Sequence, residues 1–458
     1  MLKTLPSPRL QRFRTHRHER GITLMFVVVA IFALLGVAAL TIDLVTLYVS
    51  KAEAQRVADA SALAGAKTLV DNGVTADPSN TQGNWTDACV QAIAIATAVA
   101  NQGKIGGSQP ATLTITFGSG GAFGACPTNG SPGTGFGVNP QVNVALRSTN
   151  LPLFFAKIWG QRTSTVSATS QAEGFNPSGT NVPVAAKCVA PWIMANIDPI
   201  LSTPAIPPVL PTLVPMIDTS GSTVGQIHNT GLGLPTIVGQ DIALKVGCPG
   251  SSCATQQPPN LAQPGGANPN QITYYPADLG TPAASGPGCS LSTAYEKNLV
   301  ACNPKPIACG DTIAIDTTIY PDGSGANVPN KRAFRCLTNT FATVLGNGQD
   351  TLNTGSFPYS VQAGNRNPLV ASGAIFTNDV ISSSRSVVNI PIYNSVAGVT
   401  PTSPVTVIGF AQAFVRSVRN SGRPEINILN ISGCQLPVTG TPVGTNATSS
   451  VPVRLIHQ

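Results

Sequence analysis

The stretch ITLMFVVVAIFALLGVAALTI, from Ile22 to Ile42, decides how the rest of this chain is placed, because none of its twenty-one residues is charged. As an α-helix with a rise of about 1.5 Å per residue, it would cover about 31 Å, which is the thickness of the hydrocarbon core of a bilayer. The sequence therefore predicts a membrane-spanning helix here rather than a core helix of a soluble domain.

The residues before this segment carry a strong positive charge. One acid, Glu19, and six basic residues precede Gly21, the basic ones being Lys3, Arg9, Arg12, Arg14, Arg17 and Arg20. Cytoplasmic flanks of membrane helices hold the excess of Lys and Arg. We therefore expect a cytoplasmic N-terminus and a C-terminal region that is periplasmic or extracellular.

The sequence after the apolar segment argues against a cleaved signal peptide, which would have a shorter apolar region and a small-residue cleavage site directly behind it. Here the apolar run is longer, and Asp43 is followed by more helix-forming sequence. We predict an uncleaved signal-anchor that crosses the inner (cytoplasmic) membrane once.

The charge of the chain is concentrated in the N-terminal arm. The whole chain has a net charge of +7, of which the residues before Gly21 contribute +5, so that the exported part is close to neutral. Basic arms can bind nucleic acid. Beside a membrane segment, however, the orientation of the chain in the membrane already explains these basic residues. We expect the membrane as a partner and no nucleic acid.

The helix is predicted to continue beyond the membrane as a stalk. Residues 44–69 contain no Pro, and seven of the fifteen residues from Ala52 to Ala66 are Ala, the strongest helix former. Span and stalk together would make a rod of roughly 72 Å. Gln55 and Asp59 are four residues apart and can hydrogen-bond along one face. The small stalk side chains allow close packing, either within the stalk's own domain or on a partner.

A small α+β unit is predicted to follow the stalk. WTDACVQAIAIATAVA, residues 85–100, has the composition and flanking stop signals of a helix. Alternation with period two predicts strands at 112–117 and 141–147, and β-branched residues predict another at 163–173. The apolar and aromatic segment LPLFFAKIWG, residues 151–160, is expected to form a short helix or a buried crossover.

The remainder of the chain is predicted to be mainly β. It is rich in Gly, Pro, Thr and Ser, which is typical of short strands joined by many turns. Strands are expected at 312–316, 386–390, 405–415 and 426–429, whereas residues 229–340 show no helical period and include a low-complexity stretch at 254–288.

The fold class is therefore α+β, with one transmembrane helix that continues into an Ala-rich stalk, a small α+β unit and a Cys-rich β region. The predicted divisions are a basic arm (1–21), span and stalk (22–70), an exported α+β unit (71–197), a Pro-rich connector (198–215) and a β-rich region (216–458).

All ten cysteines lie after the apolar segment, which fits an oxidising compartment. No C-x-x-C occurs, so disulfides are favoured over a zinc site. The connectivity cannot be read from spacing, although two close pairs are natural candidates for short loops: Cys248 with Cys253, and Cys302 with Cys309.

The block from Gly21 to Ala66 resembles the N-terminal domain of TadG-like proteins of the Flp (tight adherence, Tad) pilus-assembly family. Hydrophobicity alone would not supply the polar residues of this block at their separations. The matching positions are Gly21, Asp43, Tyr48, Gln55, Ala58, Asp59, Ala60, Ala62, Leu63, Ala64, Gly65 and Ala66.

The resemblance implies a bitopic envelope protein that helps to build or anchor a surface pilus. Prepilin peptidases cut type IV pilins after a Gly, and the mature pilin usually has Glu at its fifth position. Counted from Ile22, the fifth residue here is Phe26. We therefore expect Gly21 to remain uncut, and the chain not to be a major pilin.

Asp43 has two possible roles. It directly follows the apolar run and would lie about 31 Å along the helix from Ile22. This places it at the outer membrane interface, where a carboxylate can remain hydrated. It can be an interfacial charge that ends the run, or it can contact a helix of another pilus component.

A possible metal-binding loop occurs at DTSGS, residues 218–222. The pattern is similar to the D-x-S-x-S loop of von Willebrand factor A domains, in which Asp and Ser oxygens hold Mg²⁺. Here Asp218, Ser220 and Ser222 would be the ligands. Four prolines interrupt the strand that should deliver Asp218, and prolines do not suit a central strand. A turn rich in Ser and Gly is the alternative.

No catalytic constellation is apparent, since the sequence has no G-x-S-x-G and no H-E-x-x-H motif. We therefore expect a non-enzymatic, membrane-anchored protein that acts in Flp/Tad pilus assembly through contacts with other pilus-assembly or pseudopilin proteins, without a cofactor or an identified small-molecule substrate. The alternative is a metal-dependent adhesion module that uses the DTSGS loop.

Overall fold

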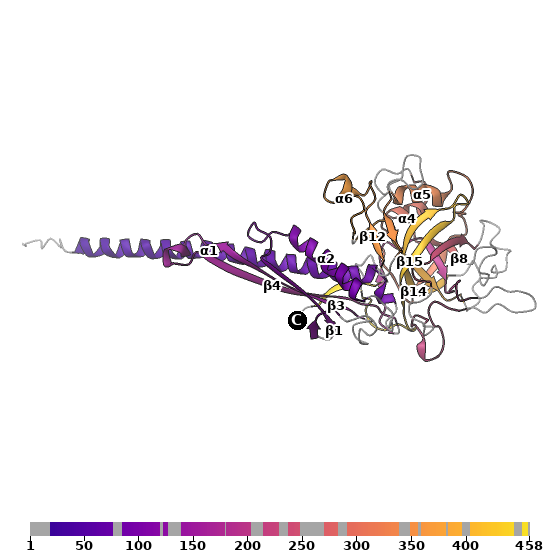
Figure 1. Ribbon diagram of the computed structural model, residues 1–458, viewed down its shortest axis with the longest axis horizontal. Helices are drawn as coiled ribbons and strands as arrows, with labels where there is room; N and C mark the ends of the chain where they lie inside the picture. The colour runs from indigo at the N-terminus through magenta and orange to yellow at the C-terminus, as the bar shows by residue number, and fades with distance from the viewer. Residues whose placement is uncertain are drawn as a thin grey trace, which may run out of the picture.

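A computed structural model of the chain shows a long helical rod that ends in a wide, β-rich head (Figure 1). It describes residues 19–76, 85–119, 122–126, 139–178, 180–202, 214–228, 237–247, 270–282, 291–338, 349–355, 359–381, 383–395, 404–443 and 451–456. Most of the predicted basic arm lies outside the described residues, as do Cys248 and Cys253.

The rod is one continuous helix, α1 (Glu19–Asp71), as the sequence predicts. Among the described residues, it is the one helix that is long and apolar enough to cross a membrane. It ends next to Gly73, whose φ of 83° is a left-handed conformation that glycine adopts without steric cost. A short 3-10 turn, η1 (Val74–Ala76), follows.

A five-stranded antiparallel sheet lies along the second half of the rod, with the strand order β16-β4-β3-β1-β2. The helix α2 (Trp85–Gln102) packs beside α1, and the two helices share a buried apolar cluster with the sheet. This confirms the predicted helix and the three predicted strands of the unit. The strands are β1 (Thr112–Ser119), β2 (Ala122–Gly124), β3 (Gln141–Pro152), β4 (Thr163–Gly174) and β16 (Val453–Ile456).

The face of α1 that meets this sheet consists of small side chains. A Cβ atom placed on Gly65 would lie 3.1 Å from Cγ1 of Val142 on β3, so the helix approaches the sheet closely at this point. The stalk therefore packs within its own domain, which was one of the two alternatives. The alanines that are fully buried on this face are Ala54, Ala58, Ala62 and Ala66.

The strands β3 and β4 form a long hairpin whose tip turns back beside α1 (Figure 1). The tip contains a 3-10 turn, η2 (Ala156–Trp159). Leu151 and Leu153 are buried, whereas Phe154 and Phe155 are exposed. The segment predicted as a short helix or buried crossover is thus a hairpin end that is only partly buried.

The head is built on a seven-stranded sheet of order β10-β14-β13-β6-β8-β7-β15. Since β15 also pairs with β14, and β10 bridges β8 and β14, the sheet closes on itself around an apolar core. Closure leaves few unpaired strand edges. The strands are β6 (Trp192–Ala195), β7 (Asp241–Val246), β8 (Gln271–Asp278), β10 (Thr312–Ile315), β13 (Val387–Tyr393), β14 (Val405–Val418) and β15 (Pro424–Gly433).

Smaller elements complete the described part of the head. Two short strand pairs flank the main sheet, and short helices lie over it. These elements are β5 (Ala185–Ala186) with β9 (Ile307–Ala308), β11 (Thr351–Asn353) with β12 (Ser360–Gln362), η3 (Gly221–Thr223), α4 (Ala294–Val300), α5 (Pro329–Leu337) and α6 (Pro368–Ala371).

The head departs from the sequence prediction between residues 229 and 340. This region was expected to lack helices, yet it contains α4 and α5, and β8 runs through the stretch regarded as low in complexity. The two helices span only seven and nine residues. Local signals were nevertheless present, since Thr293 and Glu296 form a capping box at α4 and Pro329 opens α5.

The predicted division boundaries cut across the two sheets. β6, placed in the exported unit, pairs with β8 and β13 of the head, and β16, placed in the β-rich region, pairs with β4 of the rod domain. Local composition cannot report such long-range pairing, so the boundaries could not be read from it.

The Pro-rich stretch does not behave as an extended connector at its two ends. The backbone N–H of Asp198 donates to the carbonyl of Val214 at 2.8 Å, and the N–H of Val214 donates to Oγ of Ser202 at 3.0 Å. The two ends therefore lie side by side within the head. Residues 203–213 lie outside the described residues.

Three disulfides join described cysteines: Cys89–Cys126, Cys188–Cys302 and Cys309–Cys434. The short loop proposed between Cys302 and Cys309 is therefore wrong, because each of these cysteines pairs with one more than a hundred residues away. Short sequence spacing did not predict the pairing, because the closed sheet brings distant segments together.

Candidate functional site

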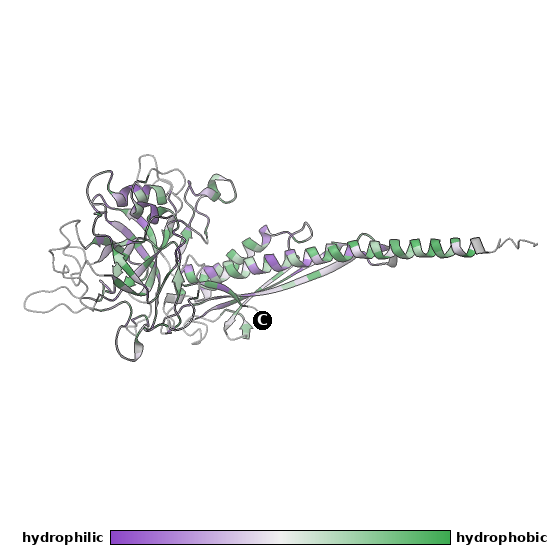
Figure 2. Ribbon diagram, turned by 180° about the vertical axis from the view of Figure 1, so that it is seen from behind, coloured by the Kyte–Doolittle hydropathy of each residue, from purple (hydrophilic) through white to green (hydrophobic). Residues whose placement is uncertain are grey.

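The first feature with a functional meaning is the bare surface of the rod. Every residue from Ile22 to Ile42 is exposed except Gly36 and Ala39, which are half-buried. Figure 2 shows the residues of this half of the rod as almost uniformly hydrophobic, whereas hydrophobic and hydrophilic residues are mixed in the head. Apolar surface on this scale is not stable in water, and its length matches a bilayer.

The outer end of this surface is marked by Asp43, which is only 3% exposed. Its carboxylate accepts three backbone hydrogen bonds from the hairpin tip: from Phe154 at 2.8 Å, from Phe155 at 3.0 Å and from Ala156 at 2.6 Å. These N–H groups belong to the start of η2, so that Asp43 acts as an N-terminal cap supplied by another element.

The structure gives Asp43 a role that neither prediction named, because its carboxylate is buried and accepts hydrogen bonds from the tip of its own domain. Asp43 still ends the apolar run, but its carboxylate is not open to solvent as the first prediction expected. The sequence offered no signal for this contact, since Asp43 and Phe154 are 111 positions apart.

Two more residues of the motif lie beside the open edge of β4. Gln55 Nε2 donates to Oδ1 of Asp59 at 2.8 Å, as the spacing predicted, and also to the carbonyl of Thr169 at 3.0 Å. One turn away, Lys51 Nζ donates to the carbonyl of Ser167. The carbonyls of a strand edge would otherwise be open to pairing with another chain. Gln55 and Lys51 therefore close this edge from the rod.

The remaining motif residues serve different purposes. Gly65 is buried against β3, whereas Tyr48 is 77% exposed. Gly21 lies near the start of the described part of α1, with open space around its Cα. The motif therefore contains residues that hold the rod to its own sheet. It also contains one large side chain, Tyr48, that remains mostly exposed.

The comparison with known families covers the same part of the molecule. Residues 21–68 match the sequence model of the family described as "Putative Flp pilus-assembly TadE/G-like". The rod carries a TadE/G-like domain. The match spans the apolar helix, Asp43, Gln55, Asp59 and Gly65, and it ends three residues before α1 does. No curated protein and no solved structure matches the chain.

The DTSGS loop lies in the head, far along the chain from the TadE/G-like domain. Asp218 Oδ1 contacts Nδ1 of His228 at 2.7 Å. The loop returns as a tight antiparallel turn, in which Ile217 bridges Ile227 and the N–H of Gly225 donates to the carbonyl of Asp218 at 2.8 Å. A von Willebrand factor A site needs a strand that leads into a helix, so the structure does not support this alternative.

Ser220 and Ser222 are exposed on that turn. Among the described residues, no group of three or more His, Cys, Asp and Glu side chains is arranged to hold a metal ion. The turn rich in Ser and Gly, which was the other interpretation of this motif, describes the local structure.

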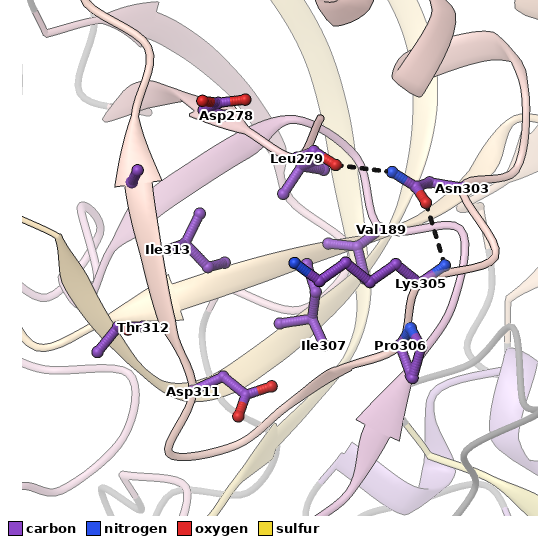
Figure 3. A pocket seen from close by; sticks show the side chains of 11 residues that line it. Val189, Asp278, Leu279, Asn303, Lys305, Pro306, Ile307, Asp311, Thr312 and Ile313 are labelled. Carbon is purple, nitrogen blue, oxygen red and sulfur yellow. Dashed lines mark hydrogen bonds between the residues drawn. The ribbon is translucent and has the colours of Figure 1, made fainter. Parts of the chain in front are cut away.

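The head also has a pocket of about 460 Å³ with an apolar floor that includes Ile307 and Ile313 (Figure 3). Lys305 extends across it, with Asp278 and Asp311 at opposite ends. Both carboxylates already accept backbone hydrogen bonds, from Gly280 at 3.1 Å and from Ala308 at 2.8 Å. Each carboxylate thus holds a turn of the backbone at its end of the pocket.

Proposed function

We propose that the chain is a membrane-anchored envelope protein that takes part in assembling or anchoring a Flp/Tad-type pilus through protein–protein contacts, without catalysis. The N-terminus lies in the cytoplasm, α1 crosses the inner membrane, and the head stands outside. The observation that carries the proposal is the TadE/G-like match on a helix that is bare and apolar over one bilayer thickness and then packs on its own sheet.

The structure also offers a surface for such contacts. Beyond Asp43, four large apolar side chains of α1 remain exposed, and they lie on the side of the helix opposite the buried Asp43 and Ser50. We call them the rod stripe, and its members are Leu44, Val45, Tyr48 and Val49. Residues 22–42 already span the hydrocarbon core, so the stripe is expected to project beyond it. A helix of another pilus component would pack against the rod stripe and bury it, because the four side chains lie on one side of the helix.

The anchoring is tested by fusing alkaline phosphatase to the C-terminus and fractionating the cells. We expect an active reporter in the membrane fraction, resistant to alkaline extraction. An inactive reporter in the soluble fraction would contradict the proposed anchor and orientation.

The contact is tested by placing a photo-crosslinking amino acid at Tyr48 in the native cell. Phe376, which is 80% exposed on the head, provides a matched aromatic control. We expect Tyr48, and not Phe376, to cross-link to a small membrane protein of the pilus machinery. Pilus assembly should also fail when Tyr48 and Val45 are both replaced by Asp, while the protein is still inserted. Normal pili in this variant would count against the stripe.

A further inference from the structure

The hairpin tip, residues 153–162 between β3 and β4, has an exposed aromatic surface that the contacts described so far do not explain. Phe154 is 58% exposed and Phe155 is 36% exposed. They are neighbours in sequence, and their backbone N–H groups are both held by Asp43. Lys157 and Arg162 on the same tip are also exposed.

The position of the tip along the rod is set by Asp43. This residue directly follows the apolar segment, so its three hydrogen bonds place the tip at the level where α1 leaves the hydrocarbon core. Ala39 and Gly36 lie four and seven residues before Asp43, on the same face of the helix. Both are half-buried, although a Cβ atom placed on Gly36 would meet nothing within 4 Å. The tip lies beside α1 (Figure 1).

Several backbone N–H groups of the tip have hydrogen-bond acceptors, as any segment that enters an apolar environment requires. Asp43 accepts from three successive N–H groups. Within the tip, Gln161 donates to the carbonyl of Ala156 at 3.2 Å, and Gly160 donates to the carbonyl of Lys157 at 3.1 Å.

We propose that the hairpin tip is a second membrane contact, in which Phe154 and Phe155 enter the interfacial zone of the outer leaflet and Lys157 and Arg162 meet lipid phosphates. Aromatic side chains flanked by cations are suited to this zone. Continuity with the span favours lipid over a protein partner, because the surface begins where the membrane surface must lie. Two attachment points would fix the tilt of the rod, which a single helix leaves free.

The inference rests on the proposed anchor, and the experiment separates the two. The full chain, reconstituted into phosphatidylcholine and phosphatidylglycerol vesicles, is compared as Phe154→Trp and Phe376→Trp, the second being a matched control on the head. Acyl chains brominated near the headgroup quench only tryptophans within the interface. We expect the bromines to quench the fluorescence that tryptophan at 154 adds. The fluorescence that tryptophan at 376 adds should not be quenched. Phe155→Trp serves as a second reporter.

Flotation of the same vesicles reports the anchor independently. Protein that fails to float would overturn the proposed function. Protein that floats, while the tryptophans at 154 and 155 are quenched no more than the one at 376, would overturn the second contact alone. A second copy of this chain covering the tip would give this same unquenched result and would also overturn it.

Discussion

Nδ2 of Asn430 in β15 donates to Oγ1 of Thr75 in η1 at 2.5 Å, and this contact joins the head to the end of the rod across 355 positions. Both residues are fully buried. Asn430 also donates to the carbonyl of Val70 at the end of α1, at 3.3 Å. Asn176 adds a second link, since its Nδ2 donates to the carbonyl of Thr75 at 2.8 Å and to that of Ile431 at 3.3 Å. The head therefore sits on the rod through buried hydrogen bonds between the two rather than on a free linker.

Replacing Asn430 with Ala is expected to loosen this junction. The change leaves Oγ1 of Thr75 and the carbonyl of Val70 without this donor in a buried site, which costs about 1–3 kcal/mol. Thermal unfolding and protease sensitivity near residues 70–76 measure the effect. Asn420→Ala, at an exposed position in the turn between β14 and β15, is the matched control and should change neither.

Asp43→Ala is expected to release the hairpin tip from the rod. Hydrogen bonds to a charged group contribute about 1.5–3 kcal/mol each, and three backbone donors lose their acceptor together. The amides of Phe154, Phe155 and Ala156 should then exchange with solvent at least about tenfold faster, since about 1.4 kcal/mol corresponds to a factor of ten. Asp87→Ala, on the exposed side of α2, should leave their exchange unchanged. Equal exchange in wild type and Asp43→Ala would show that the cap does not hold the tip.

Gly65→Leu is expected to separate the rod from its sheet. A Cβ atom there already meets Val142 at 3.1 Å and Ala96 at 3.5 Å, so the larger side chain must displace β3 or α2. Overpacking of this kind costs about 1–3 kcal/mol or more. Ala60→Leu, on the exposed face of the same helix, should be nearly neutral. The melting temperatures of the two variants in detergent decide the matter, and equal values would refute close packing at Gly65.

The head should become more stable as the pH falls from 7 toward 4, because of Asp322. Burial raises the pKa of this carboxyl to about 6 from 3.8, although the N–H of Val246, the Tyr274 hydroxyl and the charge of Arg423 favour its ionised form. The folded state therefore binds the proton more tightly than the unfolded state. The stabilisation is complete below the unfolded pKa and is lost as the pH rises through the folded pKa. The difference of about two pH units corresponds to about 3 kcal/mol.

The test compares the pH dependence of unfolding in wild type and Asp322→Asn. Fluorescence of Trp192, whose ring centroid lies 6.3 Å from that of Tyr274, reports on the head. The variant should lose the part of the pH dependence between pH 4 and 6 that the wild type shows. Parallel curves for the two proteins would assign the dependence to other groups.

Sequence patterns anticipated the regular elements best where the pattern is long. The apolar run and the alanines that follow it predicted α1, and period-two alternation predicted β1 and β3. Strands were also predicted over most of β14 and over four of the ten residues of β15. The short helices α4 and α5, of seven and nine residues, were missed because they lie in a region whose Gly, Pro and Cys content suggests irregular structure. The strands β6, β7 and β8 were not predicted, and all three lie largely buried in the closed sheet of the head.

The candidate site shows the same division between local and distant information. The spacing of Gln55 and Asp59 predicted their hydrogen bond, because residues four apart share one face of a helix. Nothing in the spacing predicted that Gln55 would also close the edge of β4 at Thr169. Likewise, the proline-interrupted approach to Asp218 argued against a metal loop, but only the tertiary structure placed His228 against its carboxylate.

By itself, the sequence determined the length of the apolar helix, its continuation as a rod and the small-residue face along that rod, because helix geometry depends on neighbours a few positions apart. Only the tertiary structure decided the partner of Asp43, the pairing of Cys302 with Cys188 and of Cys309 with Cys434, and the return of β16 to the rod domain. These contacts join residues that are far apart in the chain. Their formation depends on which apolar surfaces are buried together, and local composition does not encode that choice.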